Sequence, residues 1–264
     1  MAVVEPVASG RPALREVIGA SPADRRVVVV LLTAAVALTI NNFAADDPAW
    51  LVSALDAVGA DGLARRLHAS VTTSASAARN DLTFWAVVQI TSYVVPTALV
   101  VRFVLRERLA DHGVRVRGSI RYAAPYAALY ACALPAIAFA STTAEFQERY
   151  PFLPFAEGES WRPLLGWWAL YALQFCALEF FFRGFIVHGL APRLGTLSVF
   201  VMVVPYNMLH YGKPMLEAVA AIVGAIVLGV LALRSRSIWW GAALHICVAL
   251  TMDILSLSHR GLLT

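Results

Sequence analysis

The stretch Leu178-Glu179-Phe180-Phe181-Phe182-Arg183-Gly184 places a carboxylate and a guanidinium one helical turn apart within strongly apolar sequence. Glu179 and Arg183 are four residues apart, so on a helix their side chains lie on one face and can form an ion pair. The preceding segment, 164–178, is apolar except for Gln174. The pattern predicts a membrane-spanning helix that carries a buried ion pair. Because charges are costly inside a bilayer, such a pair indicates either a functional site or a structural clamp between helices.

The composition of the whole chain is typical of a polytopic membrane protein. Of the 264 residues, 59% are hydrophobic and only 14% are charged, whereas a soluble domain of this length carries far more polar surface. The formal charge of +4 comes from arginine, with a single lysine, Lys213. The arginines cluster in a few loops, so we interpret them as topology determinants that face anionic lipid. The predicted partner is the lipid bilayer, and no nucleic-acid partner is predicted.

Hydrophobic segments separated by charged loops predict about seven membrane spans. A bilayer core requires about 20 apolar residues per helix, and loops with an arginine excess face the cytoplasm. The loop 106–121 alone holds five arginines. This bias predicts a cytoplasmic N-terminus and an outer C-terminus. The predicted spans are 27–44, 82–105, 122–140, 164–188, 197–211, 215–233 and 238–257.

The predicted fold is therefore all-α: one polytopic membrane helix bundle in which three parts of the chain are distinguished. Residues 1–26 are predicted to form a polar cytoplasmic tail, 27–160 the N-terminal transmembrane helices and loops, and 161–264 the C-terminal helices that carry the candidate functional residues. Within the second part, 46–81 mixes apolar and charged residues, which predicts an amphipathic segment at the membrane interface. The acidic, aromatic loop 141–161 is predicted to lie outside, as an interfacial loop or a lid.

Five polar residues lie within or at the ends of three apolar segments of the C-terminal part: Glu179, Arg183, His210, His245 and Asp253. Carboxylate and imidazole groups on neighbouring helices can supply a general base and can polarise water or a carbonyl. Glu179, His210 and His245 could alternatively bind zinc. His245 and Asp253 are separated by about 12 Å along a helix, so they can line one cavity without bonding to each other. Each histidine alone is also typical of a hydrogen-bonded packing residue.

The order and spacing of these residues resemble the CAAX-protease and bacteriocin-processing family (CPBP, also called the abortive-infection family) of glutamic-type intramembrane proteases. The resemblance covers 164–257 and rests on Glu179-x-x-x-Arg183, on an aromatic-x-x-x-His pattern from Tyr206 to His210, and on a histidine in the last span. It implies a helical membrane protease without a metal. In that family a motif glutamate activates water, and the motif histidines position water and stabilise the oxyanion.

The sequence departs from the family pattern at two positions. The first family motif is Glu-Glu-x-x-x-Arg, and Leu178 occupies the position of its first glutamate. The third motif is His-x-x-x-Asn or His-x-x-x-Asp, and Ala249 occupies its last position. We therefore predict that Glu179 serves as the base, assisted by the two histidines. We further predict that Asp253, one turn beyond Ala249, orients His245 or water.

Three functions are compatible with these patterns. The leading interpretation is an intramembrane endopeptidase that hydrolyses a peptide bond of a membrane-associated protein or peptide without a cofactor. The alternative is a catalytically degenerate family member that acts as a membrane scaffold, immunity factor or binding protein, as the leucine at 178 suggests. A proton-coupled transporter would show broken helices and a repeated half, and no repeat is evident. The arginine-rich composition is typical of a GC-rich bacterial genome, which predicts the bacterial inner membrane and a membrane-anchored substrate such as a C-terminal sorting tail.

Overall fold

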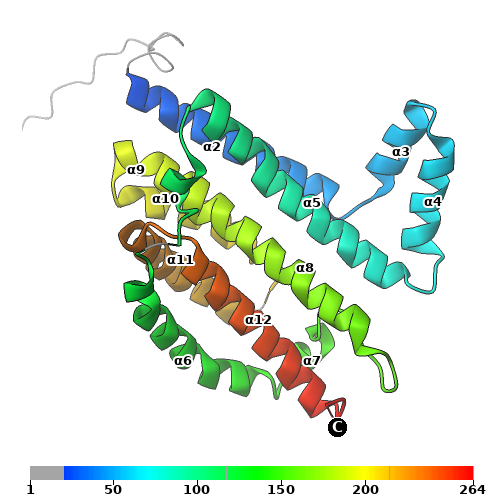
Figure 1. Cartoon of the computed structure of the whole chain (residues 1–264). Coiled ribbons are helices and arrows are strands. Elements are labelled where there is room, and N and C mark those ends of the chain that lie inside the picture. Colours follow the sequence, from blue (N-terminus) through cyan, green and yellow to red (C-terminus); the bar gives the residue numbers. More distant parts are fainter. Residues whose placement is uncertain (1–20, 117, 214, 264) are drawn as a thin grey trace, which may run out of the picture.

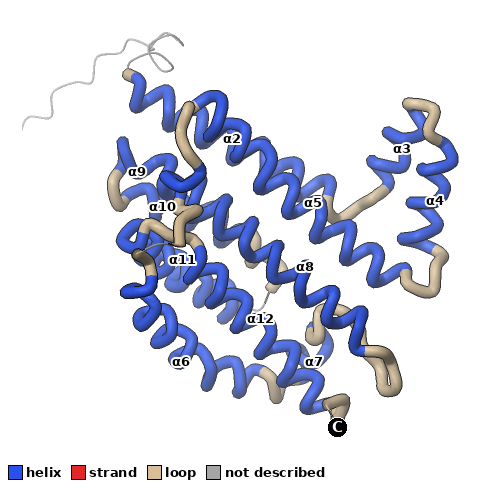
Figure 2. Tube along the Cα trace, in the orientation of Figure 1, coloured by secondary structure: helices blue, strands red, loops and turns tan. Residues whose placement is uncertain are grey.

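The computed structural model describes residues 21–116, 118–213 and 215–263, and within these ranges it consists of helices and loops without a strand (Figures 1 and 2). Four long helices lie side by side in the order α2, α5, α8 and α12. Helix α6 packs against α12, and α11 packs against α10. This arrangement confirms the predicted all-α bundle. The bounds are Pro22–Ala44 (α2), Ala77–Leu99 (α5), Ala123–Ala140 (α6), Trp161–Glu179 (α8), Leu197–Met208 (α10), Met215–Ser235 (α11) and Trp239–His259 (α12).

Six helical segments of the described chain are long and apolar enough to cross a bilayer. The predicted span 197–211 differs, because α10 has only 12 residues. At about 1.5 Å per residue it is roughly 18 Å long, whereas the hydrocarbon core is about 30 Å thick. Gly195, at a φ of 56°, ends the preceding helix just before α10 begins. The six long segments are Pro22–Ala44, Ala77–Val104, Ile120–Ala140, Trp161–Leu194, Glu217–Ser235 and Trp239–His259.

The predicted amphipathic segment between the first two long helices forms a helical hairpin. Helix α3 (Ala49–Ala57) and helix α4 (Asp61–Thr72) are joined by a turn at Gly59, which has a φ of 75°. The hairpin extends away from the bundle beyond the ends of α2 and α5 (Figure 1). On α4, Ala64 is buried and Arg65 is exposed, as expected for an amphipathic helix. Most of the predicted N-terminal tail, 1–20, lies outside the described residues, and 22–26 belong to α2.

The arginine-rich loop between α5 and α6 folds back onto the bundle. The Arg26 guanidinium of α2 donates to both carboxylate oxygens of Glu107, at 2.5 and 2.9 Å. The second of these oxygens also lies 2.8 Å from Nε2 of His112, which is buried. The Ile238 N–H, at the start of α12, donates to the Gly113 carbonyl. The loop therefore joins α2 to α12 at one end of the bundle. Which side of the membrane this end faces stays a prediction.

We expect the Glu107 contacts to stabilise the fold at neutral pH and to be lost in acid. The hydrogen bonds from Arg26, with a smaller contribution from His112, hold the pKa of the Glu107 carboxyl below its usual range despite partial burial. A lowered folded-state pKa means that the unfolded chain binds more protons. The stabilisation is therefore complete above the ordinary carboxyl pKa of about 4.3 and is lost as the pH falls through the lower folded-state value.

Replacing Glu107 by glutamine should lower stability at pH 7 by on the order of 1–2 kcal/mol and flatten its decline in acid. Thermal unfolding of the purified protein in detergent, followed from pH 7 to pH 3, measures both effects. The matched control is Glu148→Gln, because this exposed carboxylate forms no hydrogen bond or ion pair with the described part of the chain. An unchanged acid profile in Glu107→Gln would contradict the assignment.

Candidate active site

The helix that carries the Glu-Arg sequence changes its hydrogen-bond pattern at the site. Helix α8 ends at Glu179 and continues directly as the π-helix η4 (Phe180–His188), followed by the short helix α9 (Gly189–Leu194). π-Helical segments are rare and are frequent at functional sites. The sequence analysis missed this change and treated the segment as a regular helix through His188. No residue pattern in the apolar stretch distinguishes the two helix types.

Three side chains donate hydrogen bonds to backbone carbonyls of this π-helix and of Gly189, the residue that follows it. His112 Nδ1 donates to the Gly184 carbonyl at 3.2 Å, and His188 Nδ1 donates to the Arg183 carbonyl at 2.6 Å. Arg26 Nε donates to the Gly189 carbonyl at 2.5 Å. A Cβ on Gly184 would lie 2.7 Å from the His112 carbonyl oxygen, so only glycine permits this close approach. The loop at this end of the bundle therefore holds the backbone that carries Arg183.

The structure contains the predicted ion pair, fully enclosed. Arg183 Nη1 lies 2.9 Å from Glu179 Oε1, and the two side chains are 0% and 1% exposed. The guanidinium approaches at ion-pair distance but without hydrogen-bond alignment. Its Cζ atom also lies 4.3 Å from the centre of the Tyr206 ring, a cation–π contact with α10. The pair therefore connects η4 to α10 as well as to α8.

His245 of α12 connects the carboxylate to Tyr206. Its Nδ1 atom lies 3.1 Å from the Gly241 carbonyl oxygen and 3.2 Å from Glu179 Oε1. Both neighbours are acceptors, so Nδ1 carries the hydrogen and Nε2 is left as an acceptor. The Tyr206 hydroxyl lies 3.1 Å from Nε2 and donates to it. The side chain of His245 is 19% exposed, so it is the partly accessible member of the group.

Gly241 allows α12 to approach the carboxylate closely. A Cβ at this position would lie 2.3 Å from Glu179 Oε2 and 2.8 Å from its carboxyl carbon. These separations are shorter than any real van der Waals contact, so the carboxylate occupies the space of the missing side chain. The sequence analysis missed Gly241 because a single glycine near the start of a helix does not by itself indicate which group approaches it.

A series of aromatic rings connects His245 to the loop at the other end of the bundle. The His245 ring stacks on Phe175 with a centroid distance of 5.5 Å and an interplanar angle of 14°. Phe175 contacts Tyr171 at 4.6 Å, and Tyr171 stacks on Phe152 at 5.6 Å. Phe152 belongs to the predicted acidic, aromatic loop. This loop is therefore packed onto the core and braces the imidazole through α8.

The other two predicted site residues lie in different surroundings. His210 follows α10, and its Nδ1 bonds to the Tyr206 carbonyl at 3.3 Å, with the two rings 5.2 Å apart. Asp253 accepts from Trp168 Nε1 at 2.8 Å and from the Phe152 N–H at 3.2 Å. Both nitrogens of His245 have other partners, so Asp253 does not orient His245 as predicted. Glu179, Arg183 and His245 contact one another in the structure. His210 contacts Tyr206, which in turn contacts His245. A catalytic role for Asp253 stays a prediction.

The two positions at which the sequence departs from the family pattern are buried. Leu178 and Ala249 are 9% and 8% exposed, and Leu178 belongs to an apolar core cluster. In the described residues, no group of three or more His, Cys, Asp or Glu side chains is arranged to hold a metal ion. The zinc alternative at Glu179, His210 and His245 therefore has no preassembled ligand set, and the use or absence of a metal stays a prediction.

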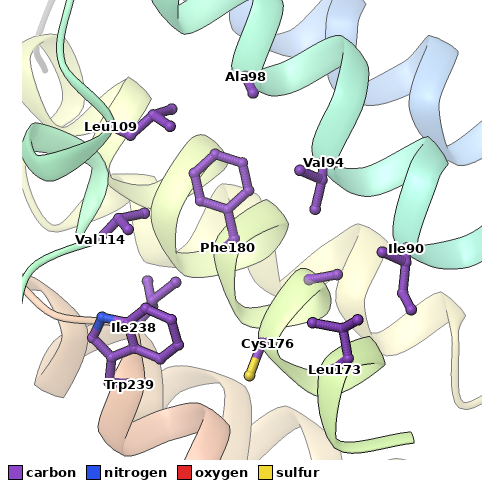
Figure 3. A pocket seen from close by; sticks show the side chains of 11 residues that line it. Ile90, Val94, Ala98, Leu109, Val114, Leu173, Cys176, Phe180, Ile238 and Trp239 are labelled. Atoms are coloured by element: carbon purple, nitrogen blue, oxygen red, sulfur yellow. The ribbon is translucent and has the colours of Figure 1, made fainter. Parts of the chain in front are cut away.

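An apolar pocket of about 290 Å³ opens beside α8, between α5 and the start of α12 (Figure 3). Its lining is carbon apart from the Cys176 thiol and the Trp239 ring nitrogen. Cys176 precedes Glu179 by three residues, so the pocket lies about one helical turn from the ion pair. The lining residues are Ile90, Val94, Ala98, Leu109, Val114, Leu173, Cys176, Ala177, Phe180, Ile238 and Trp239.

The part of the chain that carries these residues resembles a known family. Residues 160–251 match the family model described as "Type II CAAX prenyl endopeptidase Rce1-like". Comparisons with curated proteins and with solved structures gave no match. The matched segment contains Glu179, Arg183, His210 and His245 and ends before Asp253. The match supports the resemblance of this segment to the CAAX-protease and bacteriocin-processing family, which is a family of proteases.

Proposed function

We propose that this protein is an intramembrane endopeptidase that hydrolyses a peptide bond of a membrane-associated protein or peptide. The observation that carries the proposal is the contact of the buried Glu179 carboxylate with His245, at 3.2 Å, inside the segment that matches a protease family. A carboxylate beside the Nδ1–H of an imidazole is a recurrent arrangement for general-base catalysis.

In the proposed reaction Glu179 acts through His245, which differs from the sequence-based prediction that Glu179 itself is the base. The carboxylate is 1% exposed, whereas the imidazole is 19% exposed, so water reaches the imidazole first. The Gly241 carbonyl fixes the tautomer through its hydrogen bond with Nδ1, and Glu179 beside it stabilises the positive charge that forms when Nε2 accepts a proton from water. Arg183 keeps the carboxylate ionised. His210, partly exposed beside Tyr206, assists by orienting water.

The pocket beside α8 supports a substrate with an apolar segment. Its lining is carbon apart from the Cys176 thiol and the Trp239 ring nitrogen, so it can accept an apolar chain close to the ion pair. We therefore propose a membrane-anchored substrate, with a C-terminal sorting tail as one candidate. The arginine-rich loops gathered at one end support a bacterial inner-membrane protein with this end and the N-terminus in the cytoplasm.

A second candidate function is a non-catalytic membrane scaffold or binding protein. It is favoured by the buried, apolar Leu178 and Ala249 at two motif positions of the family. In this alternative the Glu179–Arg183–His245 group only holds α8, η4 and α12 together. Both candidates require the polar group for folding, so activity must be separated from accumulation.

The experiment compares the terminal peptides of membrane proteins in cells that naturally express the chain. Three alleles, Glu179→Gln, His245→Ala and the exposed control Glu148→Gln, are compared with the wild type. We expect specific termini to disappear in the first two alleles and to remain in the control, when processing is compared at matched amounts of each variant in the membrane. Unchanged termini in both site variants, together with full complementation of a deletion phenotype, would contradict the peptidase proposal and favour the scaffold function.

A further inference from the structure

Tyr206 occupies the centre of the polar group, although the motif pattern uses it only as an aromatic residue. Its hydroxyl lies 3.1 Å from His245 Nε2, and its ring lies 4.3 Å from the Arg183 Cζ atom. The side chain is 5% exposed. Its hydroxyl is therefore hydrogen-bonded to His245 Nε2, the atom that acts as the base in the proposed reaction.

The arrangement is hydroxyl, imidazole and carboxylate, in that order. The hydroxyl is hydrogen-bonded to Nε2 of His245, and the Glu179 carboxylate lies 3.2 Å from Nδ1. A hydroxyl and a carboxylate on opposite nitrogens of one imidazole are also the arrangement of the serine-protease triad. Here the hydroxyl belongs to a phenol, whose acidity makes it a good hydrogen-bond donor. The Arg183 guanidinium, with Cζ 4.3 Å from the centre of the ring, adds a cation–π attraction that holds the phenol in place.

We propose that Tyr206 is a catalytic residue that donates a hydrogen bond to the oxyanion formed during peptide hydrolysis. The proposal rests on the peptidase function proposed above. In the resting state the O–H donates to His245 Nε2. When a substrate enters, the O–H turns to the carbonyl oxygen of the peptide bond, and Nε2 becomes free to accept a proton from the attacking water.

The proton and bond changes balance without any further reactant. Water oxygen forms a bond to the carbonyl carbon, and one water proton passes to His245 Nε2. The negative charge on the carbonyl oxygen is stabilised by the Tyr206 O–H, which keeps its own proton throughout. The carbon–nitrogen bond then breaks, and the proton on Nε2 passes to the departing amine. The tyrosine thus supplies a polar donor to a site that has Leu178 and Ala249 at two motif positions.

Tyr93 provides a matched control for the hydroxyl. It is also a fully buried tyrosine, but its hydroxyl has no hydrogen-bond partner within the described residues, and its ring stacks on Phe181 at 4.7 Å. Tyr93→Phe removes a buried oxygen of the same kind without touching His245. Both substitutions keep the ring and so preserve the aromatic packing.

The test measures processing of the termini that depend on Glu179, in cells that carry Tyr206→Phe or Tyr93→Phe. Loss of one oxyanion donor costs about 10²–10³-fold in rate, so Tyr206→Phe should reduce processing on that scale while Tyr93→Phe leaves it unchanged. Membrane accumulation and thermal unfolding in detergent should be similar for the two variants. In the purified protein, ¹⁵N NMR of labelled histidine should show a shift of the His245 Nε2 resonance only in Tyr206→Phe.

The outcomes separate this proposal from the proposed function. If Glu179→Gln abolishes processing but Tyr206→Phe does not, the peptidase stands and the role of Tyr206 is overturned. If no terminus depends on Glu179, the peptidase fails, and the oxyanion role fails with it. An Nε2 resonance that does not change in Tyr206→Phe would show that the hydroxyl does not bond to His245, which also overturns the proposal.

Discussion

Replacing Arg183 by methionine should destabilise the protein by about 3–5 kcal/mol, because it leaves a buried carboxylate without its cation. Glu179 is 1% exposed and Arg183 Nη1 is its cationic neighbour at 2.9 Å. Methionine keeps most of the side-chain length, so the change removes charge more than volume. The remaining carboxylate must either take up a proton or draw in water, and both disrupt the packing of α12 against α8.

Thermal unfolding of the purified protein in detergent measures this loss, and a double variant identifies its cause. In Arg183→Met combined with Glu179→Leu, the unpaired charge is absent, so a large part of the stability should return. If the double variant is as unstable as Arg183→Met alone, the lost packing of the guanidinium on Tyr206, and not the unpaired carboxylate, carries the effect. Both variants also lose the proposed catalytic carboxylate or its counter-ion, so stability is the quantity to compare between them.

The sequence was sufficient for the fold class and for most of the polar group. Hydropathy and arginine bias depend on local composition, and five of the long spans were placed near their observed ends. Glu179 and Arg183 were predicted to pair because four residues on any helix bring side chains together. The predicted span 197–211 was longer than the observed helix, since hydropathy does not distinguish a short apolar helix from a membrane-crossing one.

The missed features all depend on contacts between distant parts of the chain. The π-helix depends on side chains such as His112, 72 residues from the carbonyl it binds. Tyr206 meets His245 across 39 positions, so no local spacing predicts the hydrogen bond. Asp253 was assigned to the site from its position along α12. Its oxygens accept hydrogen bonds from Trp168 and from the Phe152 N–H, so it does not orient His245, and its predicted role in orienting water stays a prediction.

Replacing Gly241 by alanine should reduce the proposed peptidase activity on the order of 10²-fold by displacing the carboxylate. The new Cβ would lie 2.3 Å from Glu179 Oε2, so either the side chain or the start of α12 must move. A displacement of about 1 Å in a catalytic group costs on the order of 10²-fold in rate. Overpacking should also lower stability by about 1–3 kcal/mol. This outweighs the roughly 0.5–1 kcal/mol that alanine gains over glycine within a helix.

The control is Gly166→Ala in α8, where a Cβ would meet nothing within 4 Å. Helix propensity then acts alone, so this variant should be as stable as the wild type or more stable by about 0.5–1 kcal/mol. Processing of the Glu179-dependent termini and thermal unfolding are measured for both variants. Opposite signs of the stability change for two identical substitutions show that the close approach at 241, and not the loss of a glycine, is responsible. A stable and active Gly241→Ala protein would mean that the carboxylate can move without consequence, and that the site does not depend on the contact between Glu179 and α12.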